Sequence, residues 1–255
     1  LLVIEPSMRL HYYASLAEPS FEPRLGFKYN ISEFIRFKGA TGLYSQNLIS
    51  ANSDRDVVNL FYGFLSGPDN LQKNFTDEDG NTRELNSKLQ KSTHFIAGFE
   101  FDITKKLSLN VEGYFKRFGQ LTNINRNKIF ADNEANANRP DSIKKDYIVE
   151  TGNAKGLDFV LKYTEKNFNI YLVYSLSKVD RWDGSITYSP VFDRRHNINF
   201  VASYYFGKNN SWEASVRWNY GSGFPYTPTQ GFYEKPDFNS GAQTDISKSN
   251  GDLGI

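Results

Sequence analysis

Residues 93 to 120 read THFIAGFEFDITKKLSLNVEGYFKRFGQ, and this stretch decides the fold. Apolar side chains recur at every second position on both sides of a short polar segment at 103–106. Phe95 and Phe99 share one parity, whereas Glu100 and Asp102 share the other. Because a period of two places alternate side chains on opposite faces of a strand, the stretch predicts an antiparallel hairpin with one aromatic and one charged face. Each strand covers about 10 residues, which is what a tilted strand needs to cross a bilayer.

The same unit recurs along the chain and predicts about nine strands. The alternating segments are 2–12, 24–31, 34–46, 93–103, 107–116, 157–163, 168–177, 197–206 and 212–220. Short turns near Asn30, Thr104, Glu165 and Lys208 alternate with longer loops, a plan typical of outer-membrane barrels. Nine is an odd number, whereas single-chain bacterial barrels have an even number of strands. We therefore expect residues 1–255 to be part of one larger barrel domain.

Aromatic residues stand where a barrel would meet the membrane interfaces. One set flanks the predicted short turns and consists of Tyr163, Phe168, Phe206 and Trp212. The other set lies toward the long loops and consists of Tyr12, Phe115, Trp218 and Tyr220. Since amphipathic rings prefer the membrane–water interface, the two sets are expected to form two girdles.

The composition excludes several classes of protein. The chain has 30 Lys and Arg against 29 Asp and Glu, a balance that argues against a nucleic-acid binder dominated by phosphate neutralisation. It has no cysteine, so disulfides and thiolate metal sites are excluded. No run approaches the roughly 18 apolar residues of a membrane-spanning helix. A soluble β-sandwich also alternates, but its strands are typically about 5 or 6 residues long. We therefore predict an all-β fold, a transmembrane antiparallel β-barrel.

The long segment from Asn47 to Ser92 loses the alternation. Residues 53–56 read SDRD and fit a capping box, and the apolar residues that follow at helical spacing predict a helix that ends at Gly67. These apolar residues are Val57, Leu60, Phe61 and Phe64. They either pack onto the loop itself or contact a ligand or partner. An EF-hand loop that starts at Asp77 would need Gly at its sixth and Glu at its twelfth position, but these positions hold Thr82 and Lys88, so a polar turn is predicted at 76–81.

No group of residues in the sequence is arranged for catalysis. His11, His94 and His196 lie on separate predicted strands without ligand spacing, so no metal site is expected. Neither a nucleophile with its base nor a phosphate-binding glycine loop is present, and we predict a non-enzyme without cofactors. Charged residues on one parity are expected to pair laterally, to contact a plug or to line a substrate path; they are Arg24, Lys28, Glu100, Asp102, Glu112, Asp158, Lys162, Glu213 and Arg217.

Four segments of this chain resemble TonB-dependent outer-membrane receptors of the Bacteroidota type. They are EPRLGFKYN at 22–30, GLYSQ at 42–46, FDRRHN at 192–197 and WNYGSGFPYTP at 218–228. The resemblance spans roughly residues 22–229 and depends on the order of these segments with hairpins between them. It implies a 22-stranded barrel with a globular plug, in the cell outer membrane. The plug and the final strands are expected to lie outside this sequence.

The resemblance also implies a function. Receptors of this family import a scarce, bulky nutrient such as an iron chelate, a vitamin, a glycan or a peptide. The implied partners are outer-membrane lipid, the TonB complex acting through a missing N-terminal part, and a surface lipoprotein or another outer-membrane protein; nucleic acid is not expected. The alternatives are a structural subunit of a larger outer-membrane assembly, for which the stripe 57–65 would be a contact, and a passive porin.

Aromatic and arginine side chains in the loops are the predicted ligand contacts. These residue types dominate binding hot spots. The candidates are Tyr62, Phe64, Arg126, Trp182, Tyr188, Phe224 and Tyr226.

Overall fold

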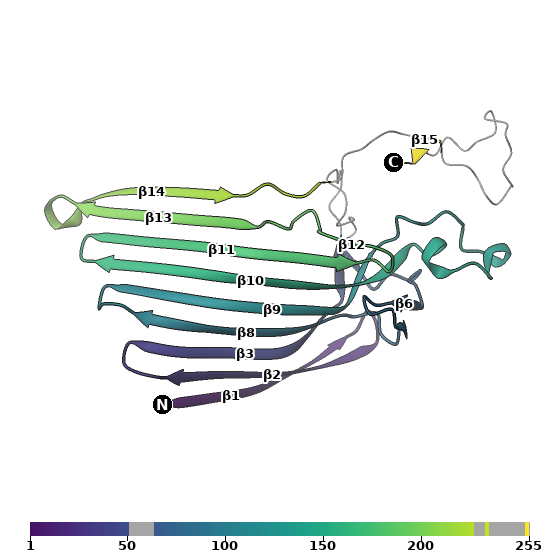
Figure 1. Ribbon diagram of the computed structural model, residues 1–255, viewed down its shortest axis with the longest axis horizontal. Coiled ribbons are helices and arrows are strands. Elements are labelled where there is room, and N and C mark those ends of the chain that lie inside the picture. The colour runs from purple at the N-terminus through teal and green to yellow at the C-terminus, as the bar shows by residue number, and fades with distance from the viewer. Residues whose placement is uncertain (51–63, 227–232, 235–252, 255) are drawn as a thin grey trace.

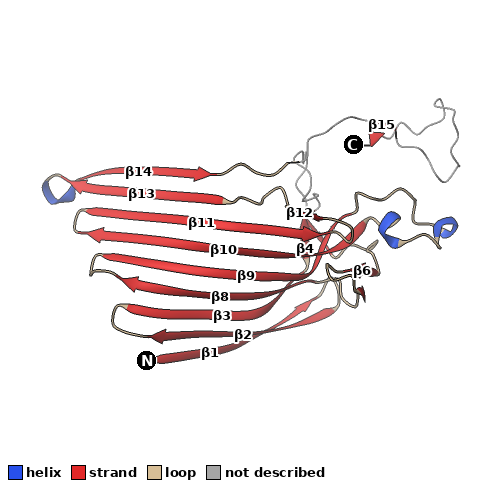
Figure 2. Ribbon diagram, in the orientation of Figure 1, coloured by secondary structure: helices blue, strands red, loops and turns tan. Residues whose placement is uncertain are grey.

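A ten-stranded antiparallel sheet makes up most of the computed structural model, which describes residues 1–50, 64–226, 233–234 and 253–254 (Figures 1 and 2). Its long strands are β1 (Leu2–Tyr13), β2 (Glu18–Asn30), β3 (Ile35–Gln46), β8 (Gln90–Asp102), β9 (Leu107–Ile124), β10 (Tyr147–Glu165), β11 (Phe168–Trp182), β13 (His196–Phe206) and β14 (Trp212–Gly221). They pair in that order, and the short strand β12 (Thr187–Tyr188) pairs with β11. The prediction of an all-β antiparallel fold with nine long strands is confirmed.

Smaller elements lie in the connections. Three short pairs are β4 (Leu48–Ser50) with β5 (Phe64–Ser66), β6 (Asn74–Thr76) with β7 (Thr82–Glu84), and β15 (Tyr233–Glu234) with β16 (Leu253–Gly254). Three 3₁₀ turns are η1 (Glu134–Asn136), η2 (Asp141–Ile143) and η3 (Lys208–Asn210). Among the described residues, no helix is long and apolar enough to cross a bilayer.

The connections divide between the two ends of the sheet, as predicted. Tight turns join β2 to β3, β8 to β9, β10 to β11 and β13 to β14 at one end, whereas the long connections gather at the other (Figure 1). We call these the turn end and the loop end. The strand order starts at β1 and stops at β14, so these two strands are the edges of the sheet.

The strand register separates the side chains into two faces. A cross-strand row on what we call the apolar face consists of Tyr29, Phe37, Phe99, Val111, Phe159, Tyr174, Ile198 and Tyr220. A row on the polar face consists of Lys28, Lys38, Gly98, Glu112, Asp158, Ser175 and Asn197. The apolar face is open to solvent: Leu10 is 62% exposed, Phe95 51% and Trp218 51%. In water such a surface would be unusual for a monomeric soluble protein.

The aromatic row predicted at the turn end is confirmed. Tyr163 contacts Phe168 with ring centroids 6.2 Å apart, and Phe168 contacts Tyr204 at 6.4 Å. Phe206 continues the row and stacks on Trp212 at 6.5 Å. The row therefore crosses four neighbouring strands on the apolar face.

Four strands (β2, β9, β10 and β11) are clearly longer than the alternation predicted, and β9 and β10 differ most. β9 continues to Ile124, and β10 starts at Tyr147, ten residues before the predicted start at Leu157. Ile148, Val149 and Glu150 are all buried, because loops cover both faces of the sheet here. A strand covered on both faces has no alternation to detect. A register shift between Glu150 and Gly152 also interrupts the pattern.

The helix predicted to end at Gly67 is wrong in its last part. Phe64–Ser66 forms strand β5, which pairs with Leu48–Ser50. Isolated helices of this length are marginal in water, so pairing with the backbone of Leu48–Ser50 is enough to replace the helical turn. The remainder of the predicted helix, residues 53–63, lies outside the described residues.

Candidate functional site

The loops at the loop end form an ordered layer on the sheet. Leu71 and Phe75 bury their side chains against Val149 of β10. Backbone contacts secure the packing, because the N–H of Gln72 donates to the carbonyl of Tyr147 at 3.0 Å and the N–H of Val149 donates to Oε1 of Gln72 at 3.2 Å. The β3–β8 connection is thus fixed to a strand whose Val149 lies 77 residues beyond Gln72 in the chain.

The β6–β7 hairpin extends this layer. Oδ1 of Asp77 accepts hydrogen bonds from the backbone N–H groups of Asp79 and Asn81, at 3.1 and 2.9 Å, which confirms the predicted polar turn. The Asn81 N–H, followed by the charge of Arg83, holds the pKa of the Asp77 carboxyl below its usual range. Nε1 of Trp182 donates to the carbonyl of Thr76 at 3.0 Å, so the hairpin is also tied to the end of β11.

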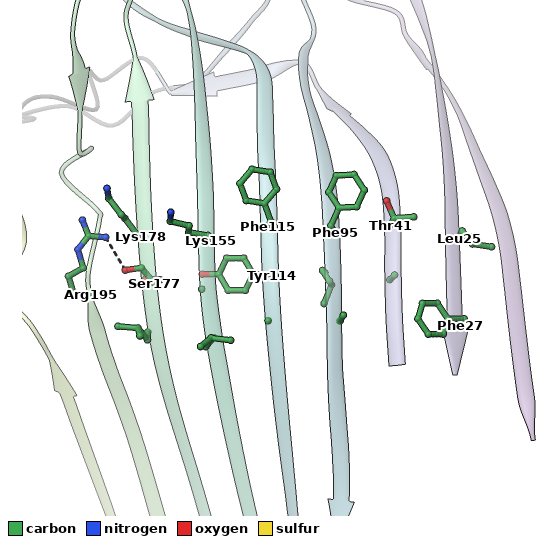
Figure 3. Close-up of a pocket in the computed structure, with 17 residues that line it drawn as sticks. Leu25, Phe27, Thr41, Phe95, Tyr114, Phe115, Lys155, Ser177, Lys178 and Arg195 are labelled. Atoms are coloured by element: carbon green, nitrogen blue, oxygen red, sulfur yellow. Dashed lines mark hydrogen bonds between the residues drawn. The ribbon is translucent and has the colours of Figure 1, made fainter. Parts of the chain in front are cut away.

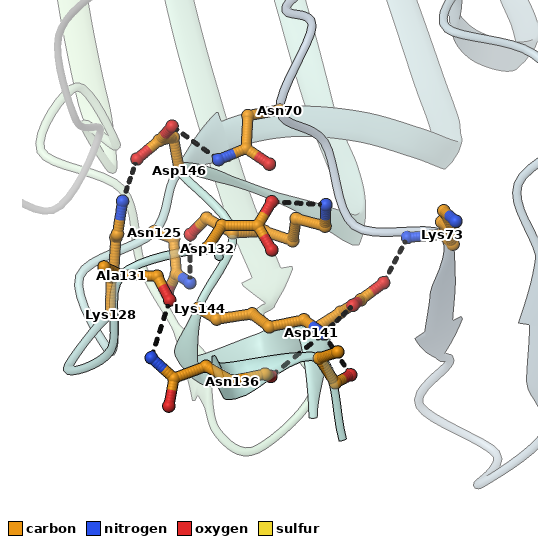
Figure 4. A network of polar contacts seen from close by, with 12 residues as sticks. Asn70, Lys73, Asn125, Lys128, Ala131, Asp132, Asn136, Asp141, Lys144 and Asp146 are labelled. Carbon is orange, nitrogen blue, oxygen red and sulfur yellow. Dashed lines mark hydrogen bonds and ion pairs between the residues drawn. The ribbon is translucent and has the colours of Figure 1, made fainter. Parts of the chain in front are cut away.

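A polar network holds the connection 125–146 against the β3–β8 connection (Figure 4). Asp146 pairs with Lys128 and accepts a hydrogen bond from Nδ2 of Asn70 at 2.6 Å. Oδ2 of Asp141 accepts from the backbone N–H of Lys73 at 3.0 Å. Two loops that are far apart in sequence are therefore joined by hydrogen bonds as well as by packing.

Lysines complete this network inside the connection. Lys144 is buried and donates from Nζ to the carbonyl of Ala137 at 2.8 Å, while Lys145 pairs with Asp132 at 2.7 Å. Lys128 lowers the pKa of Asp146, with help from Asn70, and Lys145 lowers the pKa of Asp132. Neutralising either carboxylate removes the charged partner of a lysine.

This network predicts a pH-dependent loop. A carboxyl group whose pKa is lowered by folding stabilises the folded state above the unfolded pKa of about 3.9, and that contribution is lost as the pH falls. We expect the connection 125–146 to lose protection in hydrogen exchange as the pH falls below about 4. The variant Asp146→Asn should exchange faster at pH 7 and depend less on pH. Unchanged protection across this range in the unmodified protein would contradict the role of the carboxylates.

Glu150 is the buried charge at the centre of the loop end. Its side chain is fully shielded from solvent and accepts hydrogen bonds from Nδ2 of Asn123 at 3.1 Å and from the hydroxyl of Tyr188 at 2.8 Å. Nη1 of Arg181 lies 3.6 Å from Oε2. These groups come from β9, β10, β11 and β12, so Glu150 connects four strands beneath the loops. A buried charge requires such partners.

Glu22 is a second buried carboxylate, on the polar face of β2. It pairs with Arg24 at 2.6 Å and accepts hydrogen bonds from the hydroxyl and the backbone N–H of Ser45, at 2.7 and 3.1 Å. Arg9 lies 3.7 Å away on β1. Three neighbouring strands are linked through this group.

A stack of flat side chains stands beside Glu22 on the polar face. The guanidinium of Arg24 lies 4.4 Å from the ring centroid of Tyr44, and the Tyr44 ring stacks on His94 at 4.2 Å. Phe118 meets His94 edge-on at 6.5 Å. The stack crosses β2, β3, β8 and β9, and it offers planar faces together with a positive charge. Such a surface can contact sugar rings, aromatic groups or anions.

The charged residues nearer the turn end pair across strands. Arg36 of β3 pairs with Glu100 at 3.1 Å and with Asp102 at 2.6 Å, and Lys38 also pairs with Glu100. The prediction that charges on this face pair laterally is confirmed for Glu100 and Asp102, whereas Arg24 pairs with Glu22 on its own strand. The described residues contain no group of His, Asp and Glu side chains arranged to hold a metal ion.

The predicted contact residues of the β11–β12 region have partners inside the protein. The Trp182 nitrogen is engaged with Thr76, and the Tyr188 hydroxyl with Glu150, so their polar ends hold the loop layer. Tyr62 lies outside the described residues.

The other predicted contact residues lie on separate segments. Phe64 starts β5, and Arg126 occupies an exposed position in the connection 125–146. Phe224 lies beneath the guanidinium of Arg194, 4.0 Å from its carbon to the ring centroid. Tyr226 is 69% exposed. The role of all seven residues in ligand binding stays a prediction.

Three residues of the polar-face stack were not among the predicted contacts. Tyr44, His94 and Phe118 lie within strands, whereas the prediction considered loops only. The alternation in the sequence could have identified them. His94 has the same parity as the charged residues of the stretch 93–120, which places its flat side chain on the polar face.

Comparisons with known proteins give distant likenesses. No protein-family model matches the chain, and no curated protein matches it. The chain is similar to the siderophore receptor PirA from Pseudomonas aeruginosa, with a TM-score of 0.48 and 9% identity, over 86% of this chain and 38% of that one. It is similar to the toluene transporter TbuX from Ralstonia pickettii, with a TM-score of 0.32 and 12% identity, over 86% of this chain and 59% of that one. The chain thus spans less than two thirds of either protein.

Proposed function

We propose that this sheet is part of the wall of an outer-membrane β-barrel that imports a bulky nutrient. The observation that carries the proposal is the apolar face, which extends over nine neighbouring strands and whose side chains are exposed or partly exposed on each of them. On the outside of a barrel, these apolar side chains would contact the hydrocarbon of the lipids. The paired charges of the polar face would line the lumen.

The edges of the sheet agree with this proposal. Within a bilayer, unpaired backbone N–H and C=O groups cost several kcal/mol each, so a spanning sheet has to close on itself. β1 and β14 would each pair with further strands in the complete barrel. The loop layer would face the outside, since long loops of such barrels are extracellular and short turns periplasmic.

The energy source and the bacterial group are not inferred from this geometry. We infer TonB-dependent, energised import in a bacterium of the Bacteroidota type from the sequence resemblance. The Arg24–Tyr44–His94–Phe118 stack is the described surface best suited to meet a passing solute, because it combines a cation with flat rings on the lumen side. The nutrient would therefore carry anionic or ring-shaped groups.

Uptake by the full-length protein tests this function. Cells with and without a working inner-membrane energy complex would be given ferric chelates, cobalamin, oligosaccharides and peptides in turn. We expect one class to accumulate only when the complex works. Equal accumulation without the complex would replace the proposal by a passive pore. An absence of uptake, together with a stable complex with another outer-membrane protein, would replace it by the structural-subunit alternative.

A further inference from the structure

A groove crosses the apolar face at mid-sheet, on the side nearer the loop end (Figure 3). Its volume is about 1010 Å³. Its floor is formed by the small residues Ala97 and Gly113, which face each other on β8 and β9. Phe95 and Phe115 stand one row nearer the loops and form an aromatic wall. The groove exists because this row is small on β8 and β9, where it lies between Phe95 and Phe115 on one side and Phe99 and Val111 on the other.

Cationic side chains border the groove beside the aromatic wall. Lys155, Lys178 and Arg195 all line it, and Lys155 continues the row of Phe115 on the apolar face. Figure 3 shows the three side chains close together. Three cations on neighbouring segments beside an aromatic wall require a reason.

The pairing of these cations leaves one charge without compensation. Lys178 pairs with Asp180 at 2.9 Å, and Arg195 pairs with Asp193 at 3.0 Å. Lys155 makes no ion pair within the described residues, and it stands directly opposite Lys178 in the register. Like charges directly opposite each other on one face destabilise a sheet. An anion between them would turn this repulsion into attraction.

We propose that the groove is a binding site for an anionic phospholipid. The phosphate would lie between Lys155, Lys178 and Arg195, and an acyl chain would lie along the floor at Ala97 and Gly113. Charge complementarity selects this occupant: the groove is apolar along its length and cationic at one border, as a phospholipid is apolar in its chains and anionic in its headgroup. The inference depends on the proposed function, since it requires the apolar face to meet lipid.

Lipid binding to the full-length protein tests the site. Native mass spectrometry would measure binding of phosphatidylglycerol and of phosphatidylcholine with the same acyl chains. We expect phosphatidylglycerol to bind the unmodified protein more tightly, and the double variant Lys155→Gln/Lys178→Gln to bind it about tenfold more weakly. The matched control is Lys162→Gln, which removes a lysine from the polar face of the same strand and should retain the preference.

A second variant keeps the test decisive if the double variant does not fold. Ala97→Leu fills the groove floor and leaves the cations in place, so it should weaken binding of phosphatidylglycerol. Equal binding of both lipids to the unmodified protein, or a preference that neither variant reduces, would overturn the site.

Reconstitution into phosphatidylcholine bilayers separates the two proposals. A protein that inserts without lipid preference contradicts only the groove, whereas one that does not insert contradicts the membrane-wall assignment itself.

Discussion

Replacing Val111 with Arg is expected to lower the free energy of unfolding of the membrane-inserted protein by about 2–4 kcal/mol, the cost of a cation at the bilayer midplane on the lipid face of a barrel. Val111 belongs to the apolar parity of β9 and lies between Phe99 and Phe159. Denaturant unfolding from phosphatidylcholine vesicles measures the change.

The preceding residue provides the matched control. Asn110 lies on the polar face beside Glu100, so an arginine introduced there gains a carboxylate neighbour and stays in water. Asn110→Arg should change the unfolding free energy by less than about 0.5 kcal/mol. Equal losses in the two variants would show that the faces do not meet different solvents.

Replacing Glu150 with Ala is expected to destabilise the loop end by about 3–5 kcal/mol, because it leaves buried polar partners without their acceptor. Asn123, Tyr188 and Arg181 all approach this carboxylate. The thermal unfolding midpoint and the protease sensitivity of the connections 125–146 and 183–195 measure the effect.

Two variants refine the test of Glu150. Glu150→Gln keeps an acceptor for Asn123 and Tyr188 but loses the charge facing Arg181, so its loss of stability should be smaller than that of Glu150→Ala. Glu78 lies exposed in the same loop layer, and Glu78→Ala should leave stability unchanged. Glu150→Ala as stable as the unmodified protein would mean that the buried network contributes little.

Alternation predicted the sheet well wherever its two faces meet different surroundings. The hairpin of β8 and β9 was predicted because Phe95, Phe99 and Phe101 face one way and Glu100 and Asp102 the other. The prediction missed the first ten residues of β10, where loops bury both faces and Val149 and Glu150 are equally enclosed. It also placed a helix over Phe64, because local spacing does not reveal pairing with the distant segment 48–50.

The site was less predictable than the fold. Trp182 and Tyr188 were expected to contact a ligand, and the structure gives their polar groups partners in Thr76 and Glu150. Residue type alone does not distinguish an aromatic ring that binds a ligand from one that supports a loop. The polar-face stack depends on cross-strand register, which brings Tyr44 beside His94. The composition of either strand does not determine this register.

The most direct test of the membrane wall is a spin-label scan of β9 in the reconstituted full-length protein. This chain contributes no cysteine of its own, so single cysteines at positions 107 to 116 can be labelled one at a time. Collision with oxygen, which dissolves in lipid, and with a water-soluble nickel complex would be measured at each position. If one side of β9 faces lipid, labels at odd positions should collide mainly with oxygen and labels at even positions mainly with the nickel complex. Odd positions shielded from oxygen, or no alternation between the two, would contradict the assignment of the apolar face to lipid.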